Sequence, residues 1–301
     1  MLRDTKIVAI GGGTGLSNLL SGLKHKTKNL TAIVTVTDDG GSSGRIRRDF
    51  KMAPPGDIRN CLLALSNLDN EYKSTLNYRF KSDSELYDHN IGNLLIAALY
   101  QQENSFSNAI NKAGLLLNIQ GQVIPIADNP EAILKARTES QKLLDGESEI
   151  GRNIEKILDI WIEPQNIALN KSAQNAIEVC DAVIIGPGSL YTSIIANFLF
   201  DGLVESVNKI KKPIIFVCNI SNENETSGFT IIDHVTEFKK HTNVDITHVI
   251  SNSTKTSNTS ERNDLYYEKY GYIDKIKVIN TDLINNHLNK NHDPNKLTDT
   301  I

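Results

Sequence analysis

Short runs of β-branched and other apolar residues recur along the chain, and longer segments of mixed character separate them. Runs of this length, bounded by turn residues, are typical of strands that are buried on both faces of a parallel sheet. Between them, apolar residues recur at helical spacing. Because the two patterns alternate at both ends of the chain, the sequence predicts an α/β fold in which helices cover a mostly parallel sheet.

The apolar runs predict strands at Lys6–Ile10, Thr31–Thr37, Ala182–Gly186, Pro213–Asn219, Ile246–Ile250 and Lys275–Ile279. The helical patterns predict helices directly after Gly15 and at Ile58–Ser66, Asn93–Gln102, Ser172–Val179 and Tyr191–Phe200. We assign the fold class as a Rossmann-like three-layer α/β fold with a mostly parallel sheet.

The middle of the chain departs from this alternation. Between Ser66 and Pro164 the pattern is mainly helical, with short apolar pieces such as Gln122–Ile126. We interpret residues 66–164 as a largely helical insertion in a single domain that covers residues 1–301. Two polar stretches, Ser251–Asn263 and Asn285–Asn295, lack apolar periodicity and predict loops.

Composition argues against several classes of function. The 32 basic and 36 acidic residues give a net charge of −4, which offers no general attraction to nucleic acid or to anionic membranes. No apolar stretch reaches the length of a signal sequence or a membrane span, so we expect a cytoplasmic protein. The three cysteines are widely separated and form no Cys-x-x-Cys pair, which argues against a disulfide framework or a thiolate zinc site.

A glycine-rich turn follows the first predicted strand. Gly11, Gly12, Gly13, Thr14 and Gly15 stand between this strand and an apolar helical segment. Glycines let the backbone approach a ligand closely, and the first amides of a helix favour an anion, so the turn predicts a nucleotide phosphate. Leucine at the sixth position breaks the dinucleotide fingerprint, and no P-loop lysine follows. A tight turn without a ligand is the alternative.

The second predicted strand ends in an aspartate doublet, Asp38 and Asp39, followed by two glycines and by Ser42 and Ser43. Ligands of open α/β folds bind at this edge of the sheet. Asp38 could contact a nucleotide ribose, and Asp39 could orient a hydroxyl nucleophile or hold Mg²⁺. An aspartate-capped turn is the simpler explanation.

Further polar residues are predicted at two helix starts. Asp57 is a predicted N-cap after Pro54-Pro55, while Arg59 and Asn60 could clamp a phosphate or carboxylate. A surface ion pair is the alternative for Arg59. Arg45, Arg47 and Arg48 could serve the same anion or form a solvated face.

His89 and Asn93 open another predicted helix, where a histidine could donate to a phosphate or act as a general acid, or could simply cap and pack. No second histidine has metal-ligand spacing to it, so we assign no metal site.

A second strand, glycine turn and helix occur at residues 182–193. Gly186, Gly188 and Ser189 form the turn, and Tyr191 and Thr192 follow in the first helical turn. Two such loops at the carboxyl ends of parallel strands can face one crevice, which favours a ligand with a diphosphate. Gly-x-Ser-x-Gly is absent, so we interpret Ser189 as a hydrogen-bond donor and not as a nucleophile.

These motifs together resemble the CofD-like family and, within it, the YvcK-type branch of gluconeogenesis factors. The resemblance is carried by Gly11–Leu16, Val34–Gly44, Pro54–Leu65, Arg79-Phe80, His89–Leu94, Gly186–Ser193 and Cys218-Asn219. It implies a Rossmann-like protein that binds a UDP-sugar such as UDP-N-acetylglucosamine, with Asn219 and a tyrosine, Tyr266 or Tyr267, among the ligand contacts. It also implies a regulator of cell shape and cell-wall precursor supply during growth on gluconeogenic carbon sources.

The resemblance leaves an enzyme as the alternative. CofD transferases attach a phospholactyl group from a guanosine diphospho donor to a deazaflavin, but their late loop is more similar to Gly-Pro-Ser-Asn-Pro than to residues 186–190 here. The chain departs from the YvcK pattern at Ala196, Ser221–Thr226 and Asn291. We expect no required cofactor, although Mg²⁺ could accompany a nucleotide ligand. We also expect an unidentified regulatory protein partner and a homo-oligomer. A nicotinamide dinucleotide could occupy the site without redox chemistry.

Overall fold

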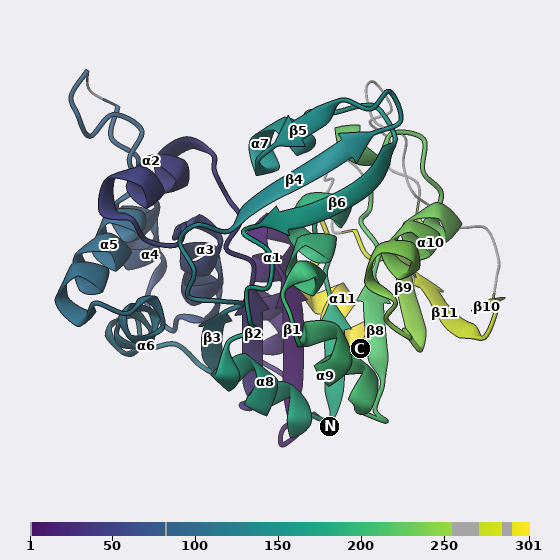
Figure 1. Cartoon of the computed structure of the whole chain (residues 1–301). Helices are drawn as coiled ribbons and strands as arrows, with labels where there is room; N and C mark the ends of the chain where they lie inside the picture. The colour runs from purple at the N-terminus through teal and green to yellow at the C-terminus, as the bar shows by residue number, and fades with distance from the viewer. Residues whose placement is uncertain (1, 82, 255–270, 285–290) are drawn as a thin grey trace.

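The computed structural model describes residues 2–81, 83–254, 271–284 and 291–301. Its main sheet has eight strands in the order β10-β11-β9-β8-β7-β1-β2-β3 (Figure 1). Their bounds are β1 Ile7–Gly11, β2 Leu30–Val34, β3 Gln122–Pro125, β7 Ala182–Ile185, β8 Ile214–Val217, β9 His248–Asn252, β10 Tyr272–Ile273 and β11 Ile276–Thr281. Strands from β11 to β3 pair in parallel, and β10 pairs antiparallel with β11. All six predicted strands are present.

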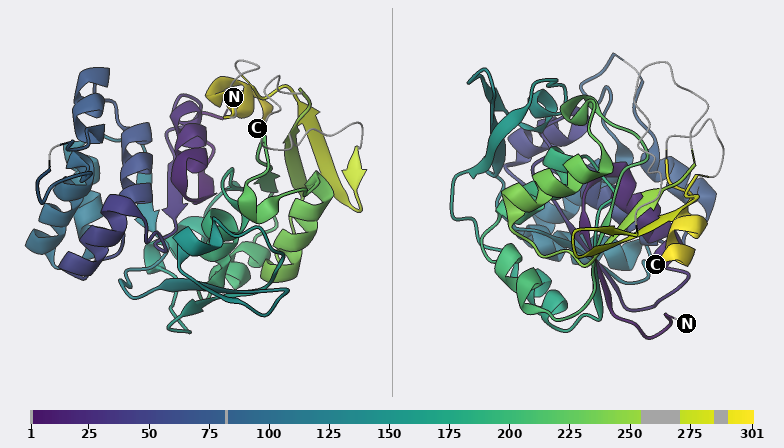
Figure 2. Two further views of the ribbon diagram at one scale, coloured as in Figure 1. Left: turned by 90° about the horizontal axis from the view of Figure 1, so that it is seen from above. Right: turned by 90° about the vertical axis from the view of Figure 1, so that its right-hand side faces the viewer.

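Helices cover both faces of this sheet (Figures 1 and 2). One face carries α1 (Gly13–Leu23), α3 (Gly56–Leu65) and α11 (Pro294–Thr300). The other carries α8 (Lys171–Glu178), α9 (Leu203–Lys209) and α10 (Ile231–Thr242). The three-layer α/β fold predicted from the alternating pattern is therefore confirmed.

The helix predicted at Tyr191–Phe200 is not a regular α-helix. A π-helical turn (Leu190–Ile194) leads into a 3₁₀ turn (Ile195–Leu199). The amides of Ser193 and Ile194 both donate to the carbonyl of Ser189, each at 3.0 Å, so the chain is wound more widely there. The amide of Tyr191 lies in the first turn, where helical amides lack an intrahelical acceptor, and it donates to the carboxylate of Glu225 at 3.0 Å. The wide first turn is therefore what departs from the predicted α-helix.

The segment 66–164 is helical in its first half and mostly stranded in its second. α4 (Asn70–Asn77), α5 (Ile91–Glu103) and α6 (Phe106–Leu116) join α2 (Gly41–Phe50) at one end of the molecule, and β3 then enters the main sheet. A separate antiparallel sheet follows, which we call the flap: β4 (Ile133–Thr138), β5 (Leu143–Asp145) and β6 (Ile157–Glu163), with the short helix α7 (Glu147–Ile150). The sequence-based prediction missed these strands because it treated residues 66–164 as largely helical, although β4 alternates buried Leu134 and Ala136 with polar residues and β6 is mostly apolar.

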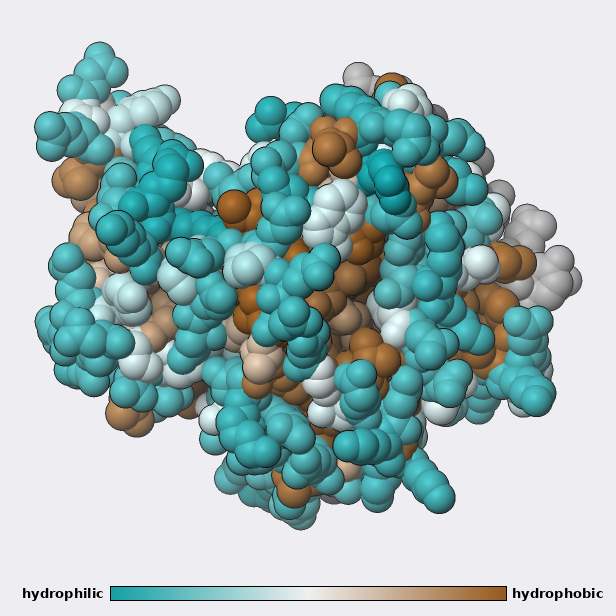
Figure 3. All heavy atoms as spheres, in the orientation of Figure 1, coloured by the Kyte–Doolittle hydropathy of each residue, from teal (hydrophilic) through white to brown (hydrophobic). Residues whose placement is uncertain are grey.

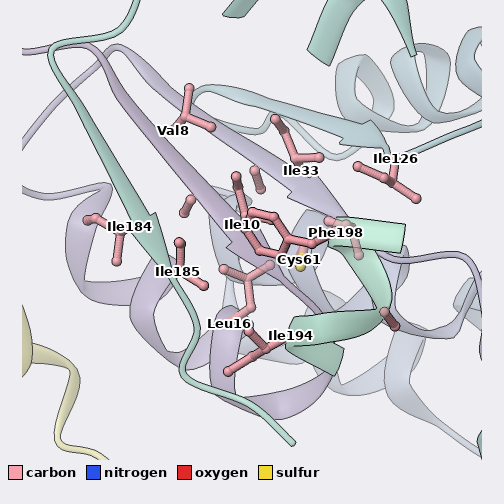
Figure 4. Close-up of a cluster of buried hydrophobic side chains, with 14 of the residues drawn as sticks. Val8, Ile10, Leu16, Ile33, Cys61, Ile126, Ile184, Ile185, Ile194 and Phe198 are labelled. Carbon is pink, nitrogen blue, oxygen red and sulfur yellow. The ribbon is translucent and has the colours of Figure 1, made fainter. Parts of the chain in front are cut away.

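The core lies between the central strands and the helices on either side. Figure 4 shows Ile10 of β1 and Ile185 of β7 packed with Leu16 of α1 and with Ile194. Cys61, Cys180 and Cys218 are buried and free. Outside the core, the face that carries the flap is mainly hydrophilic, with separate apolar patches near its middle (Figure 3).

None of the helices in the described ranges has the length and apolar character needed to cross a bilayer. Of the two predicted polar loops, Ser251 and Asn252 belong to β9, residues 255–263 lie outside the described residues, and Pro294 begins α11.

Candidate functional site

The candidate site lies at the point of the main sheet where the strand order reverses. β2 and β3 follow β1 on one side of it, and β7, β8 and β9 then follow on the other side. β1 is therefore paired with β2 on one side and with β7 on the other. The two glycine loops follow β1 and β7 directly, so they lie side by side at the carboxyl edge of the sheet. Ligands of open α/β sheets bind in the crevice at this position.

The loops line one cleft with a volume of about 230 Å³. Its lining comprises Gly12, Gly13, Thr14, Gly15, Asn18, Pro187, Gly188, Ser189, Ser193, Asn219, Ile220, Ser221, Glu223, Asn291 and His292. No lysine or arginine is among these residues, so within the described part of the site an anion would be bound by backbone amides, side-chain amides and hydroxyls, and the positive end of α1.

Glycine is required at these loops for two separate reasons. Gly13 has φ +63° and Gly186 has φ +79°, in the left-handed region that other residues avoid. At Gly15 the limit is space, because a Cβ there would lie 2.4 Å from the carbonyl oxygen of Pro187. The two loops are thus in direct backbone contact.

The second loop is held by side chains from the segment after β8. Asn219 accepts from the amide of Gly188 at 3.1 Å and donates to the carbonyl of the same residue at 2.9 Å. Ser189 donates its hydroxyl proton to Glu223, which also lines the cleft. Ser189 was predicted to donate to a ligand, and here its proton is already engaged by a carboxylate.

Several cleft residues were missed by the sequence-based prediction, including Asn18, Glu223 and His292. Asn18 follows Thr14 by one helical turn, and that spacing was the available signal. Its amide donates to the carbonyl of His292. His292 in turn donates through Nε2 to the carbonyl of Cys218 at 3.0 Å, and burial lowers its pKa to about 4. His292 is therefore a neutral side chain that fastens the C-terminal segment to the cleft.

A group of carboxylates lies behind the first glycine loop. A Cβ on Gly12 would lie 2.6 Å from Asp57 Oδ2, and one on Gly56 would lie 2.8 Å from Asp38 Oδ2. Burial and the neighbouring Asp38 raise the pKa of Asp57 to about 7, although the amide of Gly13 donates to it. The pKa of Asp38 is also raised, mainly by burial. Asp57 is not the N-cap of α3, as predicted; Pro55 has that position, and Asp57 reaches the glycine loop instead.

A polar network adjoins these carboxylates. Arg59 is buried, and its guanidinium donates to Asn93 at 3.0 Å and to Asn60 at 2.6 Å. It is not a surface ion pair. Burial and Arg79 lower its pKa to about 10. Ser42 joins the network, because its hydroxyl lies 3.2 Å from the amide of Asn93 and 3.2 Å from Nδ1 of His89.

His89 itself is buried, and that burial lowers its pKa. The cap of the helix that follows is Asn90, whose side chain accepts from the amides of Gly92 and Asn93.

Asp39 and Arg47, which were predicted to contact a ligand, instead connect the segment after β2 to the flap. Asp39 accepts from the amide of Ser148 in α7 at 2.9 Å. Arg47 donates to the carbonyls of Pro130 and Ala132 at 2.8 and 2.7 Å, at the start of the flap. Both side chains therefore position the flap beside the carboxylate group.

The remaining predicted residues do not line the cleft. Tyr191 and Thr192 are buried. The Tyr191 hydroxyl donates to Glu237 at 3.2 Å, so it points away from the cleft. Gly11 ends β1 and Gly186 follows β7, so each begins one of the two loops. Ser43 lies against Gly56 and Asp38. Tyr266 and Tyr267 lie outside the described residues.

Metal binding depends on how many ligands the protein supplies. In the described ranges no three or more His, Cys, Asp or Glu side chains are grouped so that they could hold a metal ion. Mg²⁺ commonly needs only one or two carboxylates when phosphates of the ligand complete its coordination. Asp57, which lies against Gly12 behind the cleft, and the neighbouring Asp38 are candidates for this role.

Comparison with known proteins gives consistent results over nearly the whole chain. Residues 7–290 match the family described as 2-phospho-L-lactate transferase CofD. The gluconeogenesis factor of Listeria monocytogenes is 45% identical over 244 residues, which cover 80% of this chain and 76% of that protein. The gluconeogenesis factor of Bacillus subtilis is 41% identical over 242 residues, with the same two shares. A crystal structure of a UPF0052 family member from Bacillus halodurans superposes with a TM-score of 0.92, at 30% identity and 99% coverage of both chains.

Proposed function

The chain belongs to the CofD family and is similar to its gluconeogenesis factors, and from that premise we propose that it is a regulatory protein that binds a nucleotide sugar of the UDP-N-acetylglucosamine type. Occupancy of the cleft would shift the conformation that a partner protein recognises. The output would be control of cell-wall precursor supply and cell shape during growth on gluconeogenic carbon sources.

The observation that carries this proposal is the pair of glycine loops at the strand-order reversal. The diphosphate would lie between Gly12–Gly15 and Gly188–Ser189, where backbone amides and the amino end of α1 face one cleft. Glu223 and Asn219, on the β8 side, would contact the ribose or the base, since a carboxylate accepts and an amide both donates and accepts.

The absence of a cationic side chain from the described lining has a consequence for affinity. Backbone amides and a helix dipole give weaker attraction than an arginine clamp, so a bound Mg²⁺ at Asp38 and Asp57 would add to diphosphate binding. The raised pKa of Asp57 makes this contribution depend on pH, because only the ionised carboxylate is a good metal ligand.

The test is a calorimetric binding panel of UDP-N-acetylglucosamine, UDP-glucose, UDP, NAD, GDP and GTP, each with and without Mg²⁺. We expect the uridine sugars to bind and the Gly13→Val, Gly188→Val double variant to lose binding while it retains its circular dichroism spectrum. Equal affinity of the folded double variant and the wild type for UDP-N-acetylglucosamine would refute the proposed cleft.

A CofD-like transferase is the second candidate, and the paired Asp38 and Asp57 favour it, since two carboxylates beside a phosphate loop could hold Mg²⁺ and orient an acceptor hydroxyl. Incubation with a guanosine diphospho donor, a deazaflavin acceptor and Mg²⁺ tests it directly. Formation of the phospholactyl product would establish the transferase, and absence of product with all three present would exclude that reaction.

A further inference from the structure

A second groove of about 320 Å³ lies next to the cleft along α1. Thr14, Asn18 and Asn291 line both spaces, so the two adjoin. From there the groove runs between the exposed side of α1 and the residues of α3 and α4. Thr14 and Ser21 are seven positions apart, and both line it, which corresponds to about 10 Å of helix.

Apart from Leu63 and Ala64, the groove is lined by polar side chains: Ser17 and Ser21 from α1, Asn60 from α3 and Asn77 from α4. The hydroxyls of Ser17 and Ser21 donate to the carbonyls of Thr14 and Asn18, at 2.9 and 2.7 Å, and so present acceptor oxygens to the groove. The asparagine amides can both donate and accept, so the two walls together offer what a polyhydroxylated ring requires. Among the described residues that line the groove, Lys73 is the charged one and none is acidic. This chemistry fits an uncharged sugar attached to an anionic diphosphate.

Part of the groove is held in place before any ligand binds. Arg59 donates to Oδ1 of Asn60, which leaves the amide nitrogen of Asn60 without a hydrogen-bond partner among the described residues. The amide of Asn90 donates to the backbone carbonyl of Asn77 at 2.9 Å and fixes the end of α4. The exposed side chain of Asn77 makes no hydrogen bond within the described part of the chain. Two amide groups on the wall opposite α1 are thus available to a ligand.

We propose that this groove, between α1 on one side and Asn60 and Asn77 on the other, is the subsite for the glycosyl group of the nucleotide sugar. This rests on the proposed function, because the diphosphate must lie at the glycine loops for the sugar to enter the groove at Thr14 and Asn18. The glycosyl group, not the nucleotide, would then be recognised by the groove.

Two exposed asparagines at opposite ends of α4 give a matched test. Asn77 lines the groove and Asn70 does not. Asn77→Leu, Asn70→Leu and, from the opposite wall, Ser21→Leu are compared with the wild type by calorimetry with UDP-N-acetylglucosamine and with UDP. We expect Asn77→Leu and Ser21→Leu to weaken binding of the sugar nucleotide about fivefold to tenfold, as for one lost hydrogen bond, with UDP affinity unchanged. Asn70→Leu should change neither affinity.

The outcomes separate this inference from the proposed function. If the wild type binds neither UDP nor the sugar nucleotide, both fail. If both ligands bind but Asn77→Leu and Ser21→Leu leave the preference for the sugar nucleotide intact, or weaken both ligands equally, the groove is not the glycosyl subsite and the nucleotide cleft stands.

Discussion

Replacing Asp57 with asparagine should stabilise the protein, and the gain should grow with pH. The pKa of this carboxyl is raised from 3.8 to about 7 by burial and by Asp38. At pH values between 3.8 and about 7, the Asp57 carboxyl is ionised in the unfolded chain and still protonated in the folded protein. The stability of the wild type therefore falls as pH rises from about 4 to about 7 and is level above that range. Asparagine has no proton to release, and its oxygen can still accept from the amide of Gly13.

The size of the effect follows from the pKa. A pKa raised from 3.8 to about 7 corresponds to about 4 kcal/mol. Asp57 is half-buried, and screening by water reduces the effect, so we expect roughly 2 kcal/mol at pH 8 and close to zero at pH 4. For a chain of this length 2 kcal/mol corresponds to a rise of about 3 °C in Tm.

The assay is thermal unfolding of wild type and Asp57→Asn at several pH values from 4 to 8.5 without ligand or Mg²⁺. Asp83→Asn, on an exposed loop, is the matched control and should leave Tm unchanged throughout. A difference between Asp57→Asn and wild type that is the same at pH 4.5 and pH 8 would refute the reasoning, because it would show that ionisation of Asp57 is not what burial opposes.

Three further predictions test the loops and the flap. Gly15→Ala should destabilise the protein by about 1–3 kcal/mol, because its Cβ would meet a backbone carbonyl 2.4 Å away; a Tm equal to that of wild type would show that the loops are not in contact. Asn219→Ala removes both hydrogen bonds to Gly188 and should cost about 1–3 kcal/mol in chemical denaturation while weakening UDP binding, and unchanged affinity would remove this residue from the site. Arg47→Ala should release the flap, seen as faster hydrogen exchange in residues 133–163 with α1 unaffected; equal protection in wild type and variant would contradict that link.

The glycine loops and the central strands could be predicted from the sequence because their signals are local. A β-branched run followed by glycines specifies a strand and its turn without reference to the rest of the chain. The convergence of both loops was also predictable, since the carboxyl ends of parallel strands share one edge.

Features that depend on tertiary contacts could not be predicted in this way. Asp57 has the sequence context of an N-cap, but contact with the loop after β1 decides its position. Asp39 and Arg47 lie in a stretch typical of ligand binding, yet they hold a flap whose contacts with them, at Ser148 and Pro130, are 109 and 83 positions later in the chain. Glu223 lines the cleft because Ser189 lies next to it, 34 positions earlier in the chain.

The pairing of β1 with β7 has a consequence for how the protein is made. Lys6 and Asp181 are hydrogen bonded across this pair although they are separated by 175 positions. During synthesis one edge of β1 thus stays open until more than half of the chain has emerged from the ribosome, and such an edge can pair with other chains. Contacts of this range also raise the contact order, which slows folding. A nascent chain that ends before β7 has only one of the two loops, so nucleotide binding would report that the sheet has closed around its central strand.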